Sequence, residues 1–306
     1  AQSQGAAVTM AATHETKAAP SESIFRRNMR NFLSSKLSVF FLLVTVGFLV
    51  MAVFAPWIAP HDPNEPDLFR RLIPPAWMEG GDWTYPLGCD ALGRDILSRI
   101  IYGTRVSIFI GVVVILIATT IGVLTGLAAG YLRGWVDVVF ARLVDILLGF
   151  PYLIFAIALI AMTGPGLHNI VLAMAYREWV MPFRVVRGET LATTGAEYVE
   201  AARAIGASRA NIMLLEILPN ILSPVLVIST VRMAHVIILE ASLSFLGLGV
   251  QPPTASWGSM VADGRSFMLQ EWWLSTFPGI AILLLVLSIN VVSQGLRDAF
   301  DPRFHD

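Results

Sequence analysis

The chain has 306 residues, of which 56% are hydrophobic and only 14% are charged. A soluble domain carries about 25% charged residues, so this composition argues against an ordinary soluble protein and predicts that a lipid bilayer is the solvent. The net charge of −1 argues against a nucleic-acid partner, and the single cysteine, Cys89, excludes an internal disulfide and a cysteine-cluster metal site.

The N-terminal region divides into a polar tail and an apolar run. Residues 1–30 are rich in Ala, Ser, Thr and Gln and have no apolar period, which predicts a poorly ordered tail ahead of one transmembrane domain over residues 31–306. The run 37–58 is uncharged and long enough for a membrane span, which takes about 20 residues. A signal peptide is the alternative, but its apolar region covers only about 7–15 residues.

Five further apolar segments follow, which predicts an all-α membrane protein of about six spans. The second and sixth spans carry no charge and give the strongest signal. The third contains Arg142 and Asp145, and the fourth contains Arg177, Glu178 and Arg184. The six predicted spans cover residues 37–58, 106–131, 139–162, 168–187, 218–246 and 274–296.

Lysine and arginine are distributed unevenly among the connecting segments. They are frequent before the first span, in the segment 188–217 and after the sixth span, and scarce in the loops after the third and fifth spans. Because short loops rich in Lys and Arg stay in the cytoplasm, we expect both termini and the 188–217 loop inside. The segment 59–105 then lies outside, where its prolines and tryptophans predict a packed cap or a docking surface for an external partner.

The sequence carries no motif for catalysis or for a bound cofactor. It has no phosphate-binding loop of the G-x-x-x-x-G-K-[ST] type, no H-E-x-x-H pattern and no G-x-S-x-G pattern. The five histidines are scattered without metal-ligand spacing, so we expect no metal site. We expect Cys89 to be an unpaired thiol of the outer segment with no catalytic role. Any energy for a function would come from another chain.

The loop between the fourth and fifth spans predicts a short amphipathic helix. Its apolar residues recur at i, i+3, i+4 and i+7, while Glu200 and Arg203 point the other way. Glu197 and Glu200 fall in the first turn, where the helix dipole favours acids, and Gly206 can end the helix in a left-handed conformation. The apolar face consists of Tyr198, Ala201, Ala202 and Ile205.

This helix could lie on the lipid surface or dock on another protein. A membrane-surface helix usually turns bulky Trp, Phe or Leu toward the lipid and Lys or Arg toward water. Here two alanines lie on the apolar face and two acids lie outward. Small residues let another surface approach the backbone closely, so the pattern favours a protein partner.

Several strings resemble a known family. Glu200-Ala201-Ala202, followed by Gly206 and Pro219, resembles the EAA loop of permeases in binding-protein-dependent ABC importers. More specific strings resemble the C-type dipeptide, oligopeptide and nickel permeases, and the resemblance covers most of the chain. These strings are Pro86–Arg99, Tyr102–Ser107, Glu240–Pro253, Ser256–Gly258, Phe277–Gly279 and Leu296–Arg303.

The resemblance implies an ABC importer (MetI-like) permease fold in a bacterial cytoplasmic membrane, with di- or oligopeptides as cargo and nickel or glutathione as alternative cargo. It implies a second permease subunit, two ATPase subunits that hold ATP and Mg, an extracytoplasmic substrate-binding protein and membrane lipid as partners. This chain would bind no cofactor itself. The residues implied in ATPase coupling are Glu197, Glu200, Ala201, Ala202, Arg203, Gly206 and Pro219.

Charged residues inside the predicted spans are candidates for the pathway or its gate, because ionisable groups in a membrane are costly. Arg142 and Asp145 lie at i and i+3 in the third span, and Arg232 and Glu240 lie in the fifth. Structural pairing that packs the helices is the alternative for all four. Separately, a glycine repeat at every fourth position from Gly122 to Gly130 predicts close helix packing.

Two readings from other classes compete with an importer subunit. An ion-coupled secondary transporter would need coupling ionisable groups at mid-membrane and often shows two similar halves, and the sequence shows no clear internal repeat. The second competing reading is a membrane scaffold that anchors an ATPase and transports nothing itself. ATP-dependent uptake into proteoliposomes, with and without an ATPase partner, separates the three.

Overall fold

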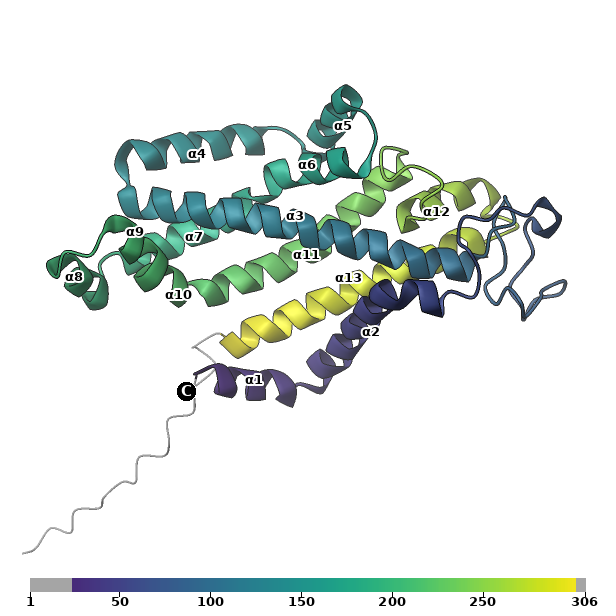
Figure 1. The fold of residues 1–306 in the computed structure, drawn as a ribbon, viewed down its shortest axis with the longest axis horizontal. Helices are drawn as coiled ribbons and strands as arrows, with labels where there is room; N and C mark the ends of the chain where they lie inside the picture. The colour runs from purple at the N-terminus through teal and green to yellow at the C-terminus, as the bar shows by residue number, and fades with distance from the viewer. Residues whose placement is uncertain (1–23, 301–306) are drawn as a thin grey trace, which may run out of the picture.

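The computed structural model describes residues 24–300, and in this range the chain forms helices joined by loops, with one isolated bridge between Cys89 and Asp95. Four helices are long and apolar enough to cross a membrane, and they run side by side along the molecule (Figure 1). The predicted all-α class is therefore confirmed. The four helices are α2 (Lys36–Ile58), α3 (Ile96–Leu132), α11 (Leu222–Phe245) and α13 (Trp273–Phe300).

Helix α3 is longer than the predicted span 106–131, because it begins at Ile96. Asp95 caps this end, since its carboxylate accepts hydrogen bonds from the backbone N–H groups of Leu97 at 3.3 Å and Ser98 at 3.0 Å. The first turns carry Arg99, whose side chain is buried and donates to the carbonyl oxygen of Pro63 in the segment before the helix. A search for uncharged runs misses this part of α3, because Arg99 and Arg105 interrupt the apolar run.

The predicted third span is two helices rather than one. Helix α4 (Gly134–Gly149) and helix α5 (Tyr152–Thr163) meet at Pro151 at an angle of 89°. Proline has no N–H to donate and pushes the residue before it out of the helical region, and Phe150 is extended accordingly. The sequence predicted a single span at 139–162, and the structure replaces it with this sharply bent pair.

The predicted fourth span, 168–187, is also divided. Helix α6 (Leu167–Glu178) has 12 residues and helix α7 (Val180–Thr193) has 14, so neither is long enough to cross a membrane alone. Helix α7 also continues beyond residue 187 into the expected loop. The described residues contain four spanning helices, or five if the bent pair counts as one, and the count of six stays a prediction.

The N-terminal tail is shorter than predicted. Helix α1 covers Ile24–Ser34, so residues 24–30 are helical, while the rest of the predicted tail lies outside the described residues. The reason is tertiary packing, because α1 lies against α13 and α2 and buries Phe32. The remaining helices are η1 (Leu68–Arg70), α8 (Glu197–Ala204), α9 (Arg209–Asn211), η2 (Ile212–Ile217), α10 (Leu218–Asn220), α12 (Trp257–Gly264) and η3 (Arg265–Phe267).

The predicted glycine repeat is a helix-packing surface. Gly122, Gly126 and Gly130 lie on α3 where it crosses α7. A methyl group on Gly126 would stand 2.9 Å from the Phe183 carbonyl oxygen, and one on Gly130 would stand 2.7 Å from Thr190 Cβ. Only glycine lets the two backbones approach this closely, so this repeat fixes α7 against α3.

Candidate functional site

Helix α8 (Glu197–Ala204) is the amphipathic helix that the sequence predicted, and it lies at one end of the helix bundle (Figure 1). Glu197 and Glu200 occupy its first turn and Arg203 its last, which complements the helix dipole. Gly206 follows with a φ of +79°, the left-handed conformation predicted for it. Ser208 then accepts a hydrogen bond from the Asn211 N–H at 3.2 Å and caps the next helix.

One side of α8 is buried against its own chain, and the other side is open. Val199 and Ala202 are buried, whereas Tyr198 and Ala201 are exposed and Ile205 is 85% exposed. The predicted apolar face of Tyr198, Ala201, Ala202 and Ile205 is therefore divided, with Ala202 packed against its own chain and the other three exposed. Ala202 follows Val199 by three residues, which places both on the same side of a helix. The surface available to a partner is therefore Tyr198, Ala201 and Ile205, which we call the open face of α8.

The buried side of α8 connects it to three long elements. Val199 and Ala202 belong to an apolar cluster that also contains Leu127 of α3, Val186 of α7 and Val225 of α11. The guanidinium of Arg203 also lies over the ring of Tyr131, 5.3 Å from its centroid. Helix α8 is therefore packed into the same apolar cluster as α3, α7 and α11. Pro219, also implied in coupling, lies in the short helix α10 that leads into α11.

A second group of charged residues meets where α6 joins α7. Arg232 of α11 donates to both carboxylate oxygens of Glu178 on α6, from Nε at 2.8 Å and from a terminal nitrogen at 2.6 and 2.8 Å. His235 Nδ1 lies 2.8 Å from that terminal nitrogen of Arg232 and 3.4 Å from Glu178 Oε1. Glu178 is only 2% exposed, so the pair neutralises a buried carboxylate. We call these residues, with Arg177 and Tyr152, the buried charge cluster.

Two members of this cluster lack polar partners. The Nε of Arg177 and the hydroxyl of Tyr152 are both buried, and neither has a hydrogen-bond partner among residues 24–300. The Arg177 guanidinium lies over the Tyr152 ring, 5.2 Å from its centroid. A cavity of about 240 Å³ opens beside Arg177, Glu178, Arg232 and His235. Buried polar groups are normally satisfied, so these two atoms are exceptions, and of the two residues only Arg177 lines the cavity.

The other predicted pathway residues lie elsewhere. Glu240 is fully buried and accepts hydrogen bonds from Ser107 at 3.2 Å and Ser244 at 2.7 Å, so it joins α11 to α3 away from the cavity. Arg142 and Asp145 form an i, i+3 pair at 3.6 Å on α4, and both side chains are largely exposed. The structure therefore brings Arg232 into a charged cluster and leaves the other three residues outside it.

The opposite end of the molecule is the cap, formed by the segment 59–95 together with α12 and its loops (Figure 1). The carboxylate of Asp90 accepts a hydrogen bond from the Nε of Arg94 at 2.7 Å and lies 3.6 Å from the Nε of Arg99. Arg99 also donates to the carbonyl oxygen of Pro63 at 3.0 Å. The motif that resembles the C-type permeases therefore closes the cap onto the first turns of α3. The packing of this segment agrees with the packed cap, one of the two structures that the sequence predicted for it.

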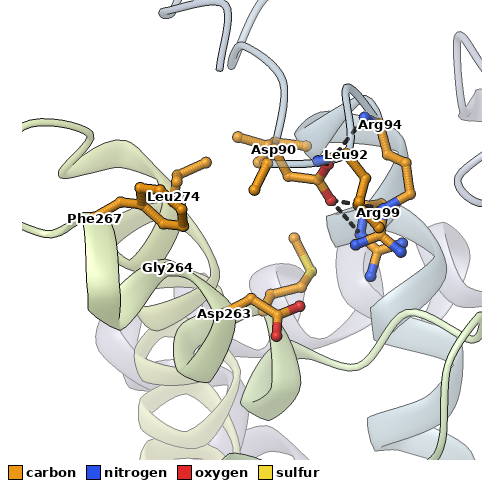
Figure 2. Close-up of a pocket in the computed structure, with 11 residues that line it drawn as sticks. Asp90, Leu92, Arg94, Arg99, Asp263, Gly264, Phe267 and Leu274 are labelled. Carbon is orange, nitrogen blue, oxygen red and sulfur yellow. Dashed lines mark hydrogen bonds and ion pairs between the residues drawn. The ribbon is translucent and has the colours of Figure 1, made fainter. Parts of the chain in front are cut away.

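A cavity of about 270 Å³ lies inside the cap. Figure 2 shows Asp90 directed toward Arg94 and Arg99, with Asp263 of α12 reaching toward the cavity from another side. Burial raises the pKa of Asp263, and the positive charges of Arg94 and Arg99 partly offset this effect. Apolar side chains, including Phe267 and Leu274, complete the wall.

Cys89 is fully buried in the cap as a free thiol. Burial, together with the nearby carboxylates of Asp95 and Asp90, raises its pKa to about 12. A thiol with so high a pKa stays protonated and unreactive near neutral pH. The thiol is unpaired, as the sequence predicted, although the residue lies in the interior of the cap rather than on its surface.

Two contacts between distant residues were missed from the sequence. Glu178 is the partner of Arg232, 54 positions later, and Asp137 of α4 forms a bidentate ion pair with Arg187 of α7, 50 positions later. Glu178 and Arg232 are opposite charges inside predicted spans, which was a signal that partners exist, whereas Asp137 lies just before the predicted third span. Nothing in the local pattern indicated which residues would meet.

The comparisons with known sequences identify the class of this protein. Residues 122–306 match the family described as binding-protein-dependent transport system inner membrane component, and residues 23–75 match the N-terminal TM domain of oligopeptide transport permease C. The chain belongs to this family of inner membrane components, so it is a multi-pass inner membrane permease rather than an enzyme.

The relatives are similar over nearly the whole chain. The di/tripeptide transport system permease protein DppC of Pseudomonas aeruginosa is 40% identical over 298 residues, which cover 96% of this chain and 98% of that protein. The dipeptide transport system permease protein DppC of Escherichia coli K12 is 42% identical over 272 residues, covering 89% of this chain and 91% of that protein.

A solved structure supports the fold. The MetNI methionine ABC transporter, in inward-facing conformations, contains a chain that matches with a TM-score of 0.55 at 17% identity. The match covers 66% of this chain and 97% of the other. The predicted ABC importer permease fold is therefore confirmed, and this likeness carries no information about cargo.

Proposed function

We propose that this chain is the transmembrane permease subunit of an ATP-driven importer that moves di- and oligopeptides across the bacterial cytoplasmic membrane. Relatives at 40–42% identity over most of the chain are named as di/tripeptide and dipeptide permeases, which supports this cargo over nickel or glutathione. A second permease subunit would complete the pathway. An extracytoplasmic substrate-binding protein would deliver the peptide to the cap.

The coupling element of this proposal is the open face of α8. Two ATPase subunits would hold ATP and Mg, and one of them would bind Tyr198, Ala201 and Ile205. An isoleucine that is 85% exposed on a helix anchored by its other side is the observation that carries this assignment. A large exposed apolar residue next to a small one fits a groove on a partner better than it fits water. Both termini and α8 would then lie in the cytoplasm.

In this mechanism the ATPases drive a rigid-body switch of access between the two sides of the membrane. Closure of the ATPases on ATP would move α8, and the apolar cluster would transmit the motion to α3, α7 and α11. The arrangement needs no chemistry from this chain. Arg142 and Asp145, which pair with each other on an exposed side of α4, remain candidates for contacts along or beside the pathway.

The test uses the assembled transporter in proteoliposomes. We expect ATP-dependent uptake of a dipeptide that requires the ATPases, and we expect Ile205→Asp to abolish both ATPase co-purification and uptake. Leu269→Asp is the matched control, because Leu269 is also a large apolar residue and is fully exposed, but it follows η3 in the cap rather than lying beside α8. It should leave ATPase co-purification unchanged.

Two further variants separate docking from folding. Ala201→Trp should block docking while the protein still folds, because Ala201 is exposed. Ala202→Trp should damage the loop itself, because Ala202 is buried in the apolar cluster. If Ile205→Asp and Ala201→Trp both retain the ATPases and normal uptake, α8 is not the coupling element. Peptide uptake that needs no ATPase would instead support a secondary transporter.

A further inference from the structure

The buried charge cluster has an unbalanced positive charge. It contains two guanidinium groups, Arg177 and Arg232, and one carboxylate, Glu178, to which Arg232 is bound by three hydrogen bonds. Within the part of the chain that the structure describes, the Nε of Arg177 has no hydrogen-bond partner, and the guanidinium lies over the Tyr152 ring rather than against a carboxylate. The surplus charge therefore resides on Arg177.

The cluster lies near the middle of the membrane-spanning region. Arg232 is ten residues from the start of α11 and thirteen from its end, which corresponds to about 15 and 20 Å along the helix. Arg177 lies ten residues into α6, with all of α7 between it and the α8 end. Both arginines are thus far from the water on either side.

The cavity beside these residues is open at the surface of this chain. The His235 side chain is 43% exposed and that of Arg232 is 19% exposed. Charged groups at this depth do not face lipid, but face the interior of a bundle or a water-filled cavity. The opening must therefore face the pathway between this chain and its partner permease.

We propose that Arg177, which lines the cavity, binds the terminal carboxylate of a peptide as it crosses the middle of the membrane. The inference rests on the proposed peptide cargo. A carboxylate would neutralise the surplus charge and accept hydrogen bonds from the guanidinium of Arg177. Every linear peptide with a free C-terminus carries this group, so the site needs to recognise no side chain.

The rest of the cluster positions this site. Glu178 binds Arg232 through both carboxylate oxygens, so Arg177 stays free to pair with the carboxylate of a peptide. The Arg177 guanidinium lies over the ring of Tyr152, and this cation–π contact helps to hold it in place. The site holds the peptide through one end only, which is compatible with release toward the cytoplasm.

The test measures dipeptide uptake and ATP hydrolysis by the complete transporter in the same proteoliposomes. We expect Arg177→Gln to lower the uptake per ATP hydrolysed at least about tenfold, while hydrolysis stimulated by the binding protein stays within about twofold of the normal rate. Arg177→Lys should restore much of the loss, because it returns the positive charge. Arg184→Gln is the matched control, since Arg184 is an exposed arginine on the adjoining helix α7 and should leave both rates unchanged.

Each outcome decides between specific alternatives. Unchanged uptake by Arg177→Gln would overturn the inference. A parallel fall in uptake and hydrolysis, or loss of the partner permease from the complex, would also overturn it and make Arg177 a structural residue or the partner of an acid on the second subunit. Absence of dipeptide uptake by the unaltered transporter, despite ATP hydrolysis, would refute the proposed cargo instead.

Discussion

Replacing Gly126 by alanine should destabilise the bundle by crowding α3 against α7. The added Cβ would stand 2.9 Å from the Phe183 carbonyl oxygen and 2.9 Å from both Cβ and Cγ1 of Val186. Ordinary carbon contacts are about 3.5–4.0 Å long, so the helices must separate by about 0.6 Å or more. The carbonyl is backbone and the valine is branched at Cβ, so neither can turn aside.

The magnitude follows from two opposing terms. Overpacking in a well-packed interior costs about 1–3 kcal/mol, whereas glycine to alanine in a helix gains up to about 1 kcal/mol in helix propensity. Gly47→Ala provides the control, because Gly47 lies in the exposed middle of α2 with nothing within 4 Å of the added Cβ. We therefore expect the free energy of unfolding of Gly126→Ala to be about 1–3 kcal/mol below that of Gly47→Ala.

The assay is unfolding of the purified subunit by SDS in mixed micelles, followed by loss of helical circular dichroism. Both variants have the same chemistry change, so their difference reports the contact between α3 and α7. If the two free energies of unfolding agree within about 0.5 kcal/mol, the crossing is looser than the structure has it and the steric argument is refuted.

Two further predictions concern the cap. Cys89 should resist alkylation by a maleimide near neutral pH until the protein is denatured, because the thiol is buried and its pKa is raised to about 12; rapid labelling of the folded protein would contradict this. Asp263→Asn should raise the melting temperature near neutral pH. Burial raises the pKa of Asp263 in the folded protein, so the folded state loses stability as the pH rises through that raised pKa and the carboxyl ionises, whereas asparagine does not ionise. The gain should vanish below about pH 4, where the carboxyl is protonated in both states, and a gain that persists there would show that the effect is not electrostatic.

Local properties of the sequence determined the long helices and the form of the α8 loop. Uncharged apolar runs located α2 and α13, because the cost of exposing polar groups to lipid is paid residue by residue along a span. Period and turn chemistry located α8 and its stop at Gly206, since a helical face and a left-handed residue are encoded within a few positions. The glycine repeat of α3 likewise predicted a close contact with another helix, although not which helix.

Tertiary structure alone decided which residues meet. The sequence could not join Arg232 to Glu178, because the pair depends on how α6 lies against α11, and it could not show that Arg177 is left over. It placed Ala202 on one apolar face with Tyr198, Ala201 and Ile205, because periodicity gives a face but not which of its residues the rest of the chain will bury. The sequence predicted one span across Pro151 and could not give the angle of 89°, because the proline interrupts the backbone hydrogen bonds and the packing of the flanking helices then sets the direction.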